Sequence, residues 1–294
     1  MRFFVSLLVD GALAGAIYAL IALAFVVVYK ASHMVNFALG EWAMLGTRLV
    51  ATGLYVAGLE LPGSFAMAAV ATIVLAVAFN RLVLSHLVGR PLVSVIMVTL
   101  GLGAVLRGAA PLIFGGIPGV IPLPISPEPL VVYGVLVSTG KLVAAVVATV
   151  AIALLSWFFS RTRTGLALKA IADDQQVAMA MGIDVRRHFS VTWAIMGALS
   201  LVAGTLWAFA FGGGFGVLLI GLKVFPIAII GGLDSVPGVL VSATAIGVLE
   251  SLAAGYLDPL AGAGLSSIFS YVALLATLSV RPRGMFGRPA VERV

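Results

Sequence analysis

Apolar stretches long enough to cross a lipid bilayer recur along nearly the whole chain. A transmembrane helix needs about 20 mostly apolar residues to span a hydrocarbon layer of about 30 Å. Stretches near this length cover residues 4–29, 37–53, 63–80, 92–110, 141–160, 189–211, 238–256 and 264–280. Because 62% of the residues are hydrophobic and the mean hydropathy is +1.21, we predict an all-α fold, a polytopic transmembrane helical bundle.

A ninth apolar stretch, residues 222–233, is too short for a regular crossing. Its helix would extend only about 18 Å, at about 1.5 Å per residue. Such a short piece is tolerated at membrane depth where protein or a water-filled cavity surrounds it. The prediction is therefore 8–9 spans, including a short broken or re-entrant segment; the sequence leaves open whether 222–233 crosses.

The first apolar stretch shares features with a secretory signal, since it follows Arg2 and contains small residues. Asp10 and Gly11 interrupt it early, however, and the hydrophobic sequence then resumes as far as Tyr29. We therefore expect a membrane helix at this position, and residues 1–294 are predicted to form a single transmembrane domain.

Lys and Arg are distributed unevenly among the predicted loops, and short cytoplasmic loops are the ones that are usually basic. The basic segments are 81–90, 161–188 and the tail after residue 280, whereas 54–62, 111–140, 212–220 and 257–263 contain no Lys or Arg. If 222–233 crosses, this pattern predicts nine crossings with the N-terminus out and the C-terminus in. The Pro- and Gly-rich loop 111–140 would then be an extracytoplasmic cap or a docking surface. The same bias explains most of the net charge of +6 without nucleic acid.

The sequence lacks the motifs of several kinds of catalytic site. It has no cysteine, its three histidines lack metal-ligand spacing, and neither G-x-S-x-G nor H-E-x-x-H occurs. The phosphate-binding motif G-x-x-x-x-G-K-[ST] is also missing, so the chain does not supply its own ATPase by that motif. We therefore expect no enzyme, no metal site and no cofactor bound by this chain.

One polar stretch, KAIADDQQVAMAMGID at residues 169–184, lies in a basic segment that is predicted to be cytoplasmic. Asp173 followed by Gln176 fits the start of a helix, and Asp174 is an equally good cap one residue later. Apolar residues then recur on one face, and a glycine suits the position after the helix. These residues are Val177, Ala178, Met181 and Gly182.

The segment around this short helix, residues 161–188, is longer than two antiparallel helices require. The helix is therefore either a solvated connector or an element that docks in a groove on a partner.

Three stretches carry a family resemblance that extends over nearly the whole chain. They are GALAGAIYALIALAFVVVYKASHMVNFALGEWAMLG (11–46), RTRTGLALKAIADDQQVAMAMGIDVRRH (161–188) and GLKVFPIAIIGGLDSVPGVLVSATAIGVLESL (221–252). They resemble the opening segment, the cytoplasmic loop and the Gly-rich late segment of permease subunits in bacterial ABC importers of the branched-chain amino acid family. Two positions depart from the family's pattern: Gln175 replaces a frequent proline, and Leu39 replaces a frequent histidine.

The resemblance implies that the short polar helix is a coupling helix, which sits in a cleft of a cytoplasmic ATPase subunit. The residues that would carry the coupling are Asp173, Asp174, Gln175, Val177, Ala178, Met181 and Gly182. It also implies a transmembrane permease domain in the bacterial inner membrane, which imports a branched-chain or aliphatic amino acid, or a similar small solute such as urea or an amide, by alternating access.

The partners that the resemblance implies are cytoplasmic ATPase subunits, which hydrolyse the ATP, and an extracytoplasmic solute-binding protein. A second permease, either a homologous subunit or a copy of this chain, would complete the pathway within the membrane lipid.

Polar and charged residues inside apolar stretches mark either a transport pathway or an internal pair of charges. The candidate pathway residues are Asn36, Phe37, Glu41, Gly231 and Gly232. Glu41 and Arg48 lie about two helical turns apart on one face, so they belong to a polar pathway, form a structural ion pair or extend to the membrane surface. Arg107 and Lys223 are expected at the membrane interface.

Glycines indicate two places where the chain comes close to itself or breaks. Gly11 and Gly15 form a G-x-x-x-G pair, which allows close helix approach. Gly231, Gly232 and Gly238 surround Asp234 and Pro237 and would break a helix, as in transport cavities, or simply allow tight packing.

An ion-coupled secondary transporter or a channel for a small neutral solute is the alternative function. Proton or sodium coupling usually relies on carboxylates in the membrane interior. Here Glu41 and Glu250 are the main ones, and this scarcity favours the ATP-driven importer.

Overall fold

The computed structural model describes residues 2–87, 91–122, 128–132, 135–233, 235–261, 264–281 and 284–287. Asp234, part of the loop 111–140 and parts of the basic segments 81–90 and 281–294 lie outside these residues. All nine apolar stretches correspond to helices, with the bounds α1 Arg2–Ser32, α2 Leu39–Tyr55, α3 Leu61–Leu82, α4 Leu92–Phe114, α5 Thr139–Arg161, α8 Val185–Phe211, α9 Ile220–Gly231, α10 Val236–Tyr256 and α12 Phe269–Val280.

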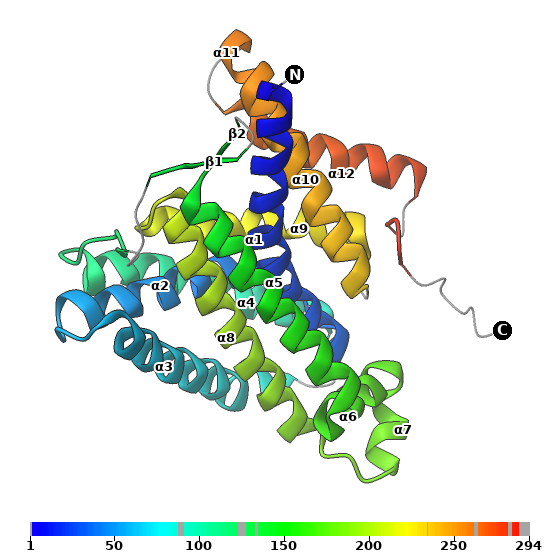
Figure 1. The fold of residues 1–294 in the computed structure, drawn as a ribbon. Helices are drawn as coiled ribbons and strands as arrows, with labels where there is room; N and C mark the ends of the chain where they lie inside the picture. The colour runs from blue at the N-terminus through cyan, green and yellow to red at the C-terminus, as the bar shows by residue number, and fades with distance from the viewer. Residues whose placement is uncertain are drawn as a thin grey trace.

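Short elements connect these helices (Figure 1). They are η1 Leu84–Leu87, β1 Leu130–Val132, β2 Val135–Val137, α6 Arg163–Asp173, α7 Gln175–Ala180, η2 Phe215–Leu219, α11 Asp258–Ala261 and η3 Leu265–Ile268. Among the described residues, six helices are long and apolar enough to cross a membrane, namely α1, α3, α4, α5, α8 and α10. The prediction of an all-α polytopic bundle is confirmed.

Helix α1 runs through the middle of the bundle and contacts α5, α8, α9 and α10 (Figure 1). It is apolar on all sides, which is typical of a helix with no solvent-facing side, and residues 17–28 are all buried. A Cβ on Gly11 would lie 2.6 Å from Cα of Val248, and one on Gly15 would lie 2.7 Å from Cα of Thr244. The prediction of close helix approach at this glycine pair is confirmed, and α10 is the partner.

The last apolar stretch, 264–280, differs from the regular crossing that was expected. Gly264 has φ +106°, η3 follows it, and α12 then has only 12 residues. The carboxylate of Asp258 accepts hydrogen bonds from the backbone N and the Oγ of Ser266, each at 2.9 Å. These bonds hold the chain in a turn where a continuous helix would begin, so the stretch is broken.

The loop 111–140 contains a small hairpin that the sequence analysis did not predict. Strands β1 and β2 pair antiparallel, with Leu130 opposite Val137 and Val131 opposite Leu136. The hairpin lies near the start of α1, at the opposite end of the molecule from α6 and α7 (Figure 1).

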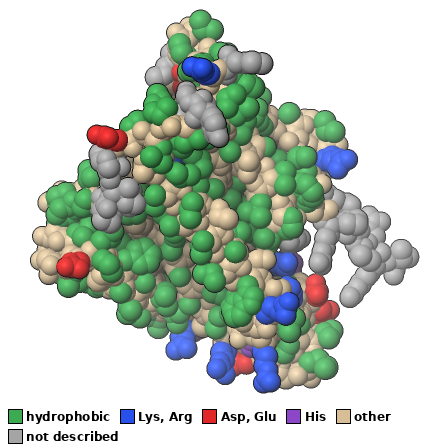
Figure 2. All heavy atoms as spheres, viewed as in Figure 1, with side chains coloured by type: hydrophobic (Ala, Val, Ile, Leu, Met, Phe, Trp, Pro, Cys, Tyr) green, Lys and Arg blue, Asp and Glu red, His purple; other side chains and the backbone are tan. Residues whose placement is uncertain are grey.

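Charged side chains are concentrated at the ends of the molecule. Figure 2 shows that Lys and Arg gather at the end that carries α6 and α7, whereas hydrophobic side chains cover the middle. Among the exposed apolar residues are Val70, Val105 and Leu154, on three of the long apolar helices. Such a surface suits contact with lipid, and the chain is a multi-pass membrane protein.

Candidate functional site

The short helix α7 begins at one of the two predicted caps. Oδ1 of Asp174 accepts hydrogen bonds from the backbone N of Gln176 at 2.9 Å and of Val177 at 3.0 Å. Asp174 is therefore the cap, while Asp173 is the last residue of α6. Gly182 follows the helix with φ +82°, a conformation that favours glycine. Both ends of the predicted helix are confirmed.

The outer face of α7 differs in one residue from the predicted apolar face. Val177, Met179 and Met181 are 58%, 51% and 77% exposed, whereas Ala178 is 2% exposed and belongs to the main hydrophobic core. Ala178 points inward because α7 packs against α6 and α8. Gln175 lies half-buried in the first turn. The exposed apolar face therefore contains Met179 in place of Ala178.

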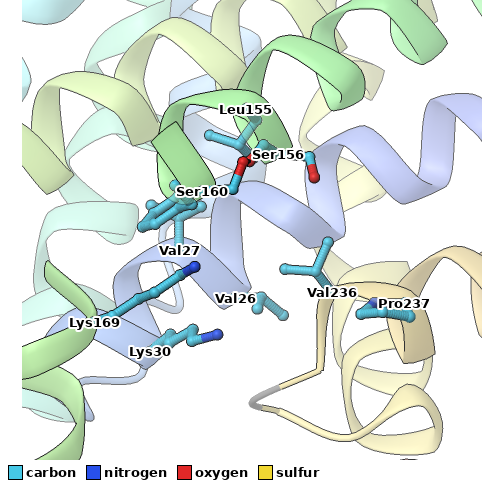
Figure 3. Close-up of a pocket in the computed structure, with 10 residues that line it drawn as sticks. Val26, Val27, Lys30, Leu155, Ser156, Ser160, Lys169, Val236 and Pro237 are labelled. Atoms are coloured by element: carbon cyan, nitrogen blue, oxygen red, sulfur yellow. The ribbon is translucent and has the colours of Figure 1, made fainter. Parts of the chain in front are cut away.

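A pocket of about 210 Å³ lies where α6 meets the membrane helices (Figure 3). Lys169 of α6 and Lys30 near the end of α1 extend toward it, and Ser156 and Ser160 of α5 lie beside it. Val236, at the start of α10, forms another part of the wall. Since α6 continues into α7 and packs against α1, α5 and α8, a displacement of α7 can be transmitted to these helices.

The candidate pathway residues before α2 are held against other helices. Asn36 is fully buried, and its Oδ1 accepts a hydrogen bond from the backbone N of Ala38 at 3.0 Å. The ring of Phe37 stacks on that of Phe225 in α9, with 4.8 Å between the centroids. These contacts explain why α2 begins at Leu39, two residues after the predicted start.

Glu41 and Arg48 lie on the same helix but do not form a pair. Glu41 is 4% exposed and forms an ion pair with Arg107 of α4, which packs beside α2. Arg48 instead donates a hydrogen bond to the carbonyl O of Ile117 at 3.0 Å and lies 3.9 Å above the ring of Phe215. Arg107 is therefore not only an interfacial residue, as was expected, but the partner of a buried carboxylate.

Two further ion pairs each join residues of two different helices. Nζ of Lys223 in α9 donates to Oε2 of Glu250 in α10 at 2.6 Å, and the Tyr18 hydroxyl donates to the same oxygen at 2.8 Å. Nζ of Lys141 in α5 lies 2.7 Å from both oxygens of Asp10 in α1. The sequence analysis missed both pairs. Intramembrane charges of opposite sign were the available signal, but no spacing rule joins them across helices.

The glycine candidates lie at the C-terminal end of α9. Gly232 ends the helix with φ +95°, and a Cβ on Gly231 would lie 2.6 Å from the carbonyl carbon of Gly238 in α10. The predicted break is therefore present, and Gly231 supports tight packing between α9 and α10. The structure does not place these glycines beside Glu41, because α2 contacts the opposite end of α9, where Gly40 meets Gly221.

Known proteins resemble this chain over almost its full length. The family model for "Branched-chain amino acid transport system / permease component" matches residues 7–278. The chain is 30% identical to the high-affinity branched-chain amino acid transport system permease protein BraD of Pseudomonas aeruginosa, over 98% of this chain and 97% of BraD. It is 28% identical to the corresponding permease protein LivH of Escherichia coli K12, over 99% of this chain and 98% of LivH.

A solved structure, that of PsaBC from Streptococcus pneumoniae in complex with Fab, has a similar fold. Its TM-score is 0.51 at 17% sequence identity, and the match covers 94% of this chain and 92% of that one. At this identity the likeness concerns the fold alone.

Proposed function

The chain belongs to the family of permease components of branched-chain amino acid transport systems, which makes it a transmembrane subunit of an ABC importer, and we propose that it imports a branched-chain or other aliphatic amino acid. Import would proceed by alternating access. A second permease, identical or homologous, would complete the pathway, and an extracytoplasmic solute-binding protein would deliver the amino acid.

We further propose that α7 is the coupling helix, which docks in a cytoplasmic ATPase subunit. The observation that carries this proposal is a short helix, capped at both ends, with an exposed apolar face at the basic end of an apolar bundle. Amphipathic helices with such a face bind in apolar grooves. The contact of α6 with α1, α5 and α8 gives the docked helix a direct mechanical link to the membrane helices.

The double variant Asp174→Arg with Val177→Asp is expected to lose the ATPase subunit and at least tenfold of its ATP-driven uptake. The first change removes the helix cap, which costs about 1 kcal/mol, and the second places a charge in an apolar contact. The measurement is co-purification from native membranes, followed by assays of ATP hydrolysis and uptake.

A matched control makes the same kinds of change in the connection between α2 and α3. Glu60→Arg with Val56→Asp also replaces an acid and an exposed valine, which is 68% exposed. This control is expected to keep the ATPase and the uptake. If the α7 variant retained its ATPase, or if the control lost it equally, α7 would not be the coupling element.

The orientation of the chain, N-terminus out and C-terminus in, is part of the proposal. The sequence has no cysteine, so single cysteines can report sidedness without background. We expect a membrane-impermeant maleimide to label Val56→Cys in intact cells, but to label Met179→Cys only after permeabilisation. Both positions are exposed. Labelling of Met179→Cys in intact cells would reverse the assignment.

A further inference from the structure

A cavity of about 410 Å³ lies between α1, α5, α8, α9 and α10, and it contains both of the ion pairs that the sequence analysis missed. Its charged lining residues are Asp10, Lys141, Lys223 and Glu250. The volume falls in the usual range of small-molecule sites, about 300–1,000 Å³. The cavity therefore has the size and the polar groups of a binding site.

The polar groups of this cavity are not all satisfied by the protein. Oε2 of Glu250 accepts hydrogen bonds from both Lys223 and Tyr18. Oε1 of the same carboxylate is buried and has no hydrogen-bond partner among the described residues. A buried acceptor without a donor is costly, the more so when it is charged, and it usually indicates a water, an ion or a ligand. Because Glu250 lines the cavity, a rotation of its carboxyl group would bring Oε1 to a ligand ammonium group.

The charges of the cavity balance, because it contains two carboxylates and two ammonium groups. A ligand with a single net charge would leave one charge unpaired in a partly buried site, which is unfavourable. A ligand that carries one ammonium and one carboxylate adds no net charge. Each end of such a ligand can pair with a group of opposite sign on the wall.

Apolar and aromatic surface adjoins the charged groups. Nζ of Lys141 lies 4.9 Å from the ring centroid of Phe211, and Leu7 and Ala14 of α1 complete this part of the wall. The ring of Trp207 in turn lies 4.3 Å from that of Phe211. Apolar walls with a few placed polar groups are typical of sites for small amphipathic molecules.

We infer that this cavity binds the zwitterionic head of a free aliphatic α-amino acid, with its ammonium group at Oε1 of Glu250 and its carboxylate at the ammonium groups of Lys141 and Lys223. This inference rests on the proposed function, because it assigns the residues of this chain that contact the transported amino acid. The aliphatic side chain lies against Phe211 and the apolar residues of α1.

The test uses the chain with its co-purifying subunits in nanodiscs without phosphatidylethanolamine, and it measures binding of radiolabelled leucine without the solute-binding protein. Glu250→Gln is expected to weaken leucine binding at least tenfold, because the amide oxygen carries no charge for the ammonium. The matched control Glu60→Gln changes an exposed acid outside the cavity and is expected to bind as the wild type does. Leucinamide and N-acetylleucine, which each lack one charge, are expected to compete at least tenfold less well than leucine.

A second variant separates ligand binding from folding. Asp10→Lys with Lys141→Asp keeps an ion pair at a partly exposed position, since the two side chains are 35% and 17% exposed, but reverses its direction. A merely structural pair tolerates this exchange, whereas a site that orients a zwitterion loses leucine affinity at least tenfold. Thermal unfolding of each variant shows whether it is folded. If Glu250→Gln does not fold, leucine binding by the variant with the exchanged Asp10 and Lys141 charges tests the proposal.

The two levels of the proposal fail in different ways. If the wild-type assembly takes up leucine but both cavity variants bind it within twofold of the wild type, the cavity assignment is overturned and the proposed function stands. If the wild-type assembly neither binds nor takes up any aliphatic amino acid, the proposed function itself fails. Loss of leucine binding when phosphatidylethanolamine is added to the nanodiscs would overturn the assignment in favour of a lipid head group of the same chemistry.

Discussion

Replacing Lys223 by methionine is expected to lower the free energy of unfolding by about 3–5 kcal/mol. The side chain of Glu250 is 8% exposed, and Lys223 is the only cationic side chain that pairs with it in the described part of the chain. Methionine fills a similar volume but leaves the carboxylate buried without a countercharge. The Tyr18 hydroxyl remains as a neutral donor, which does not replace the lost charge.

A double variant shows whether the loss comes from the orphaned charge. Lys223→Met with Glu250→Gln removes both charges and keeps an oxygen that accepts from Tyr18, so most of the stability should return. Lys169→Met, a lysine of α6 that forms no ion pair with the described residues, is the matched control and should change stability by about 0.5 kcal/mol or less. Unfolding by denaturant in detergent measures all four proteins. Equal losses in the single and double variants would mean that the lysine stabilises the bundle through packing alone.

The helices could be predicted from sequence because each one is apolar along its length. A chain that carries nine such stretches has few ways to satisfy its backbone in lipid other than helices. The ends of the helices were less predictable. The backbone before α2 is non-helical because the Asn36 side chain hydrogen-bonds to Ala38, and 264–280 is interrupted because Asp258 binds Ser266. Each of these two helix ends depends on a side-chain hydrogen bond whose partner is known only from the folded structure.

The loop helix could also be predicted, because capping is a local property. Asp174 and Gly182 act on backbone groups only a few residues away, so their spacing carries the information. The inward orientation of Ala178 depends instead on the packing of α7 against α6 and α8. The apolar pattern of so short a helix does not determine which side faces the protein.

The charged pairs could not be predicted from sequence, because their members are far apart. Glu41 and Arg107 are 66 residues apart, Lys223 and Glu250 are 27 apart, and Asp10 and Lys141 are 131 apart. Spacing rules for helices concern residues three or four apart. The expected relation between Glu41 and Arg48 rested on helical periodicity within one helix, whereas in the structure α4 supplies the cation that pairs with Glu41.

The Glu41–Arg107 pair is expected to respond asymmetrically to the loss of either partner. The Glu41 side chain is 5% exposed and that of Arg107 is 61% exposed. Arg107→Leu leaves a buried carboxylate unpaired and should cost about 3–5 kcal/mol of unfolding free energy. Glu41→Gln keeps an oxygen that accepts the hydrogen bond and leaves a largely exposed cation, so it should cost about 1 kcal/mol or less. Denaturant unfolding of the two variants measures the difference. Equal losses of unfolding free energy would contradict the expectation that only the Glu41 carboxylate is costly to leave unpaired.

The same glutamine variant discriminates between the two classes of transport. In an ion-coupled carrier a buried membrane carboxylate carries the coupling charge, so Glu41→Gln would abolish concentrative uptake. In the ATP-driven importer Glu41 is a structural partner of Arg107, so Glu41→Gln should keep at least half of the wild-type uptake. That uptake should persist when ionophores collapse the ion gradients and stop when ATP is depleted. Uptake that instead required the gradient and the Glu41 carboxylate would overturn the assignment of Glu41 as a structural residue and make it part of the coupling machinery.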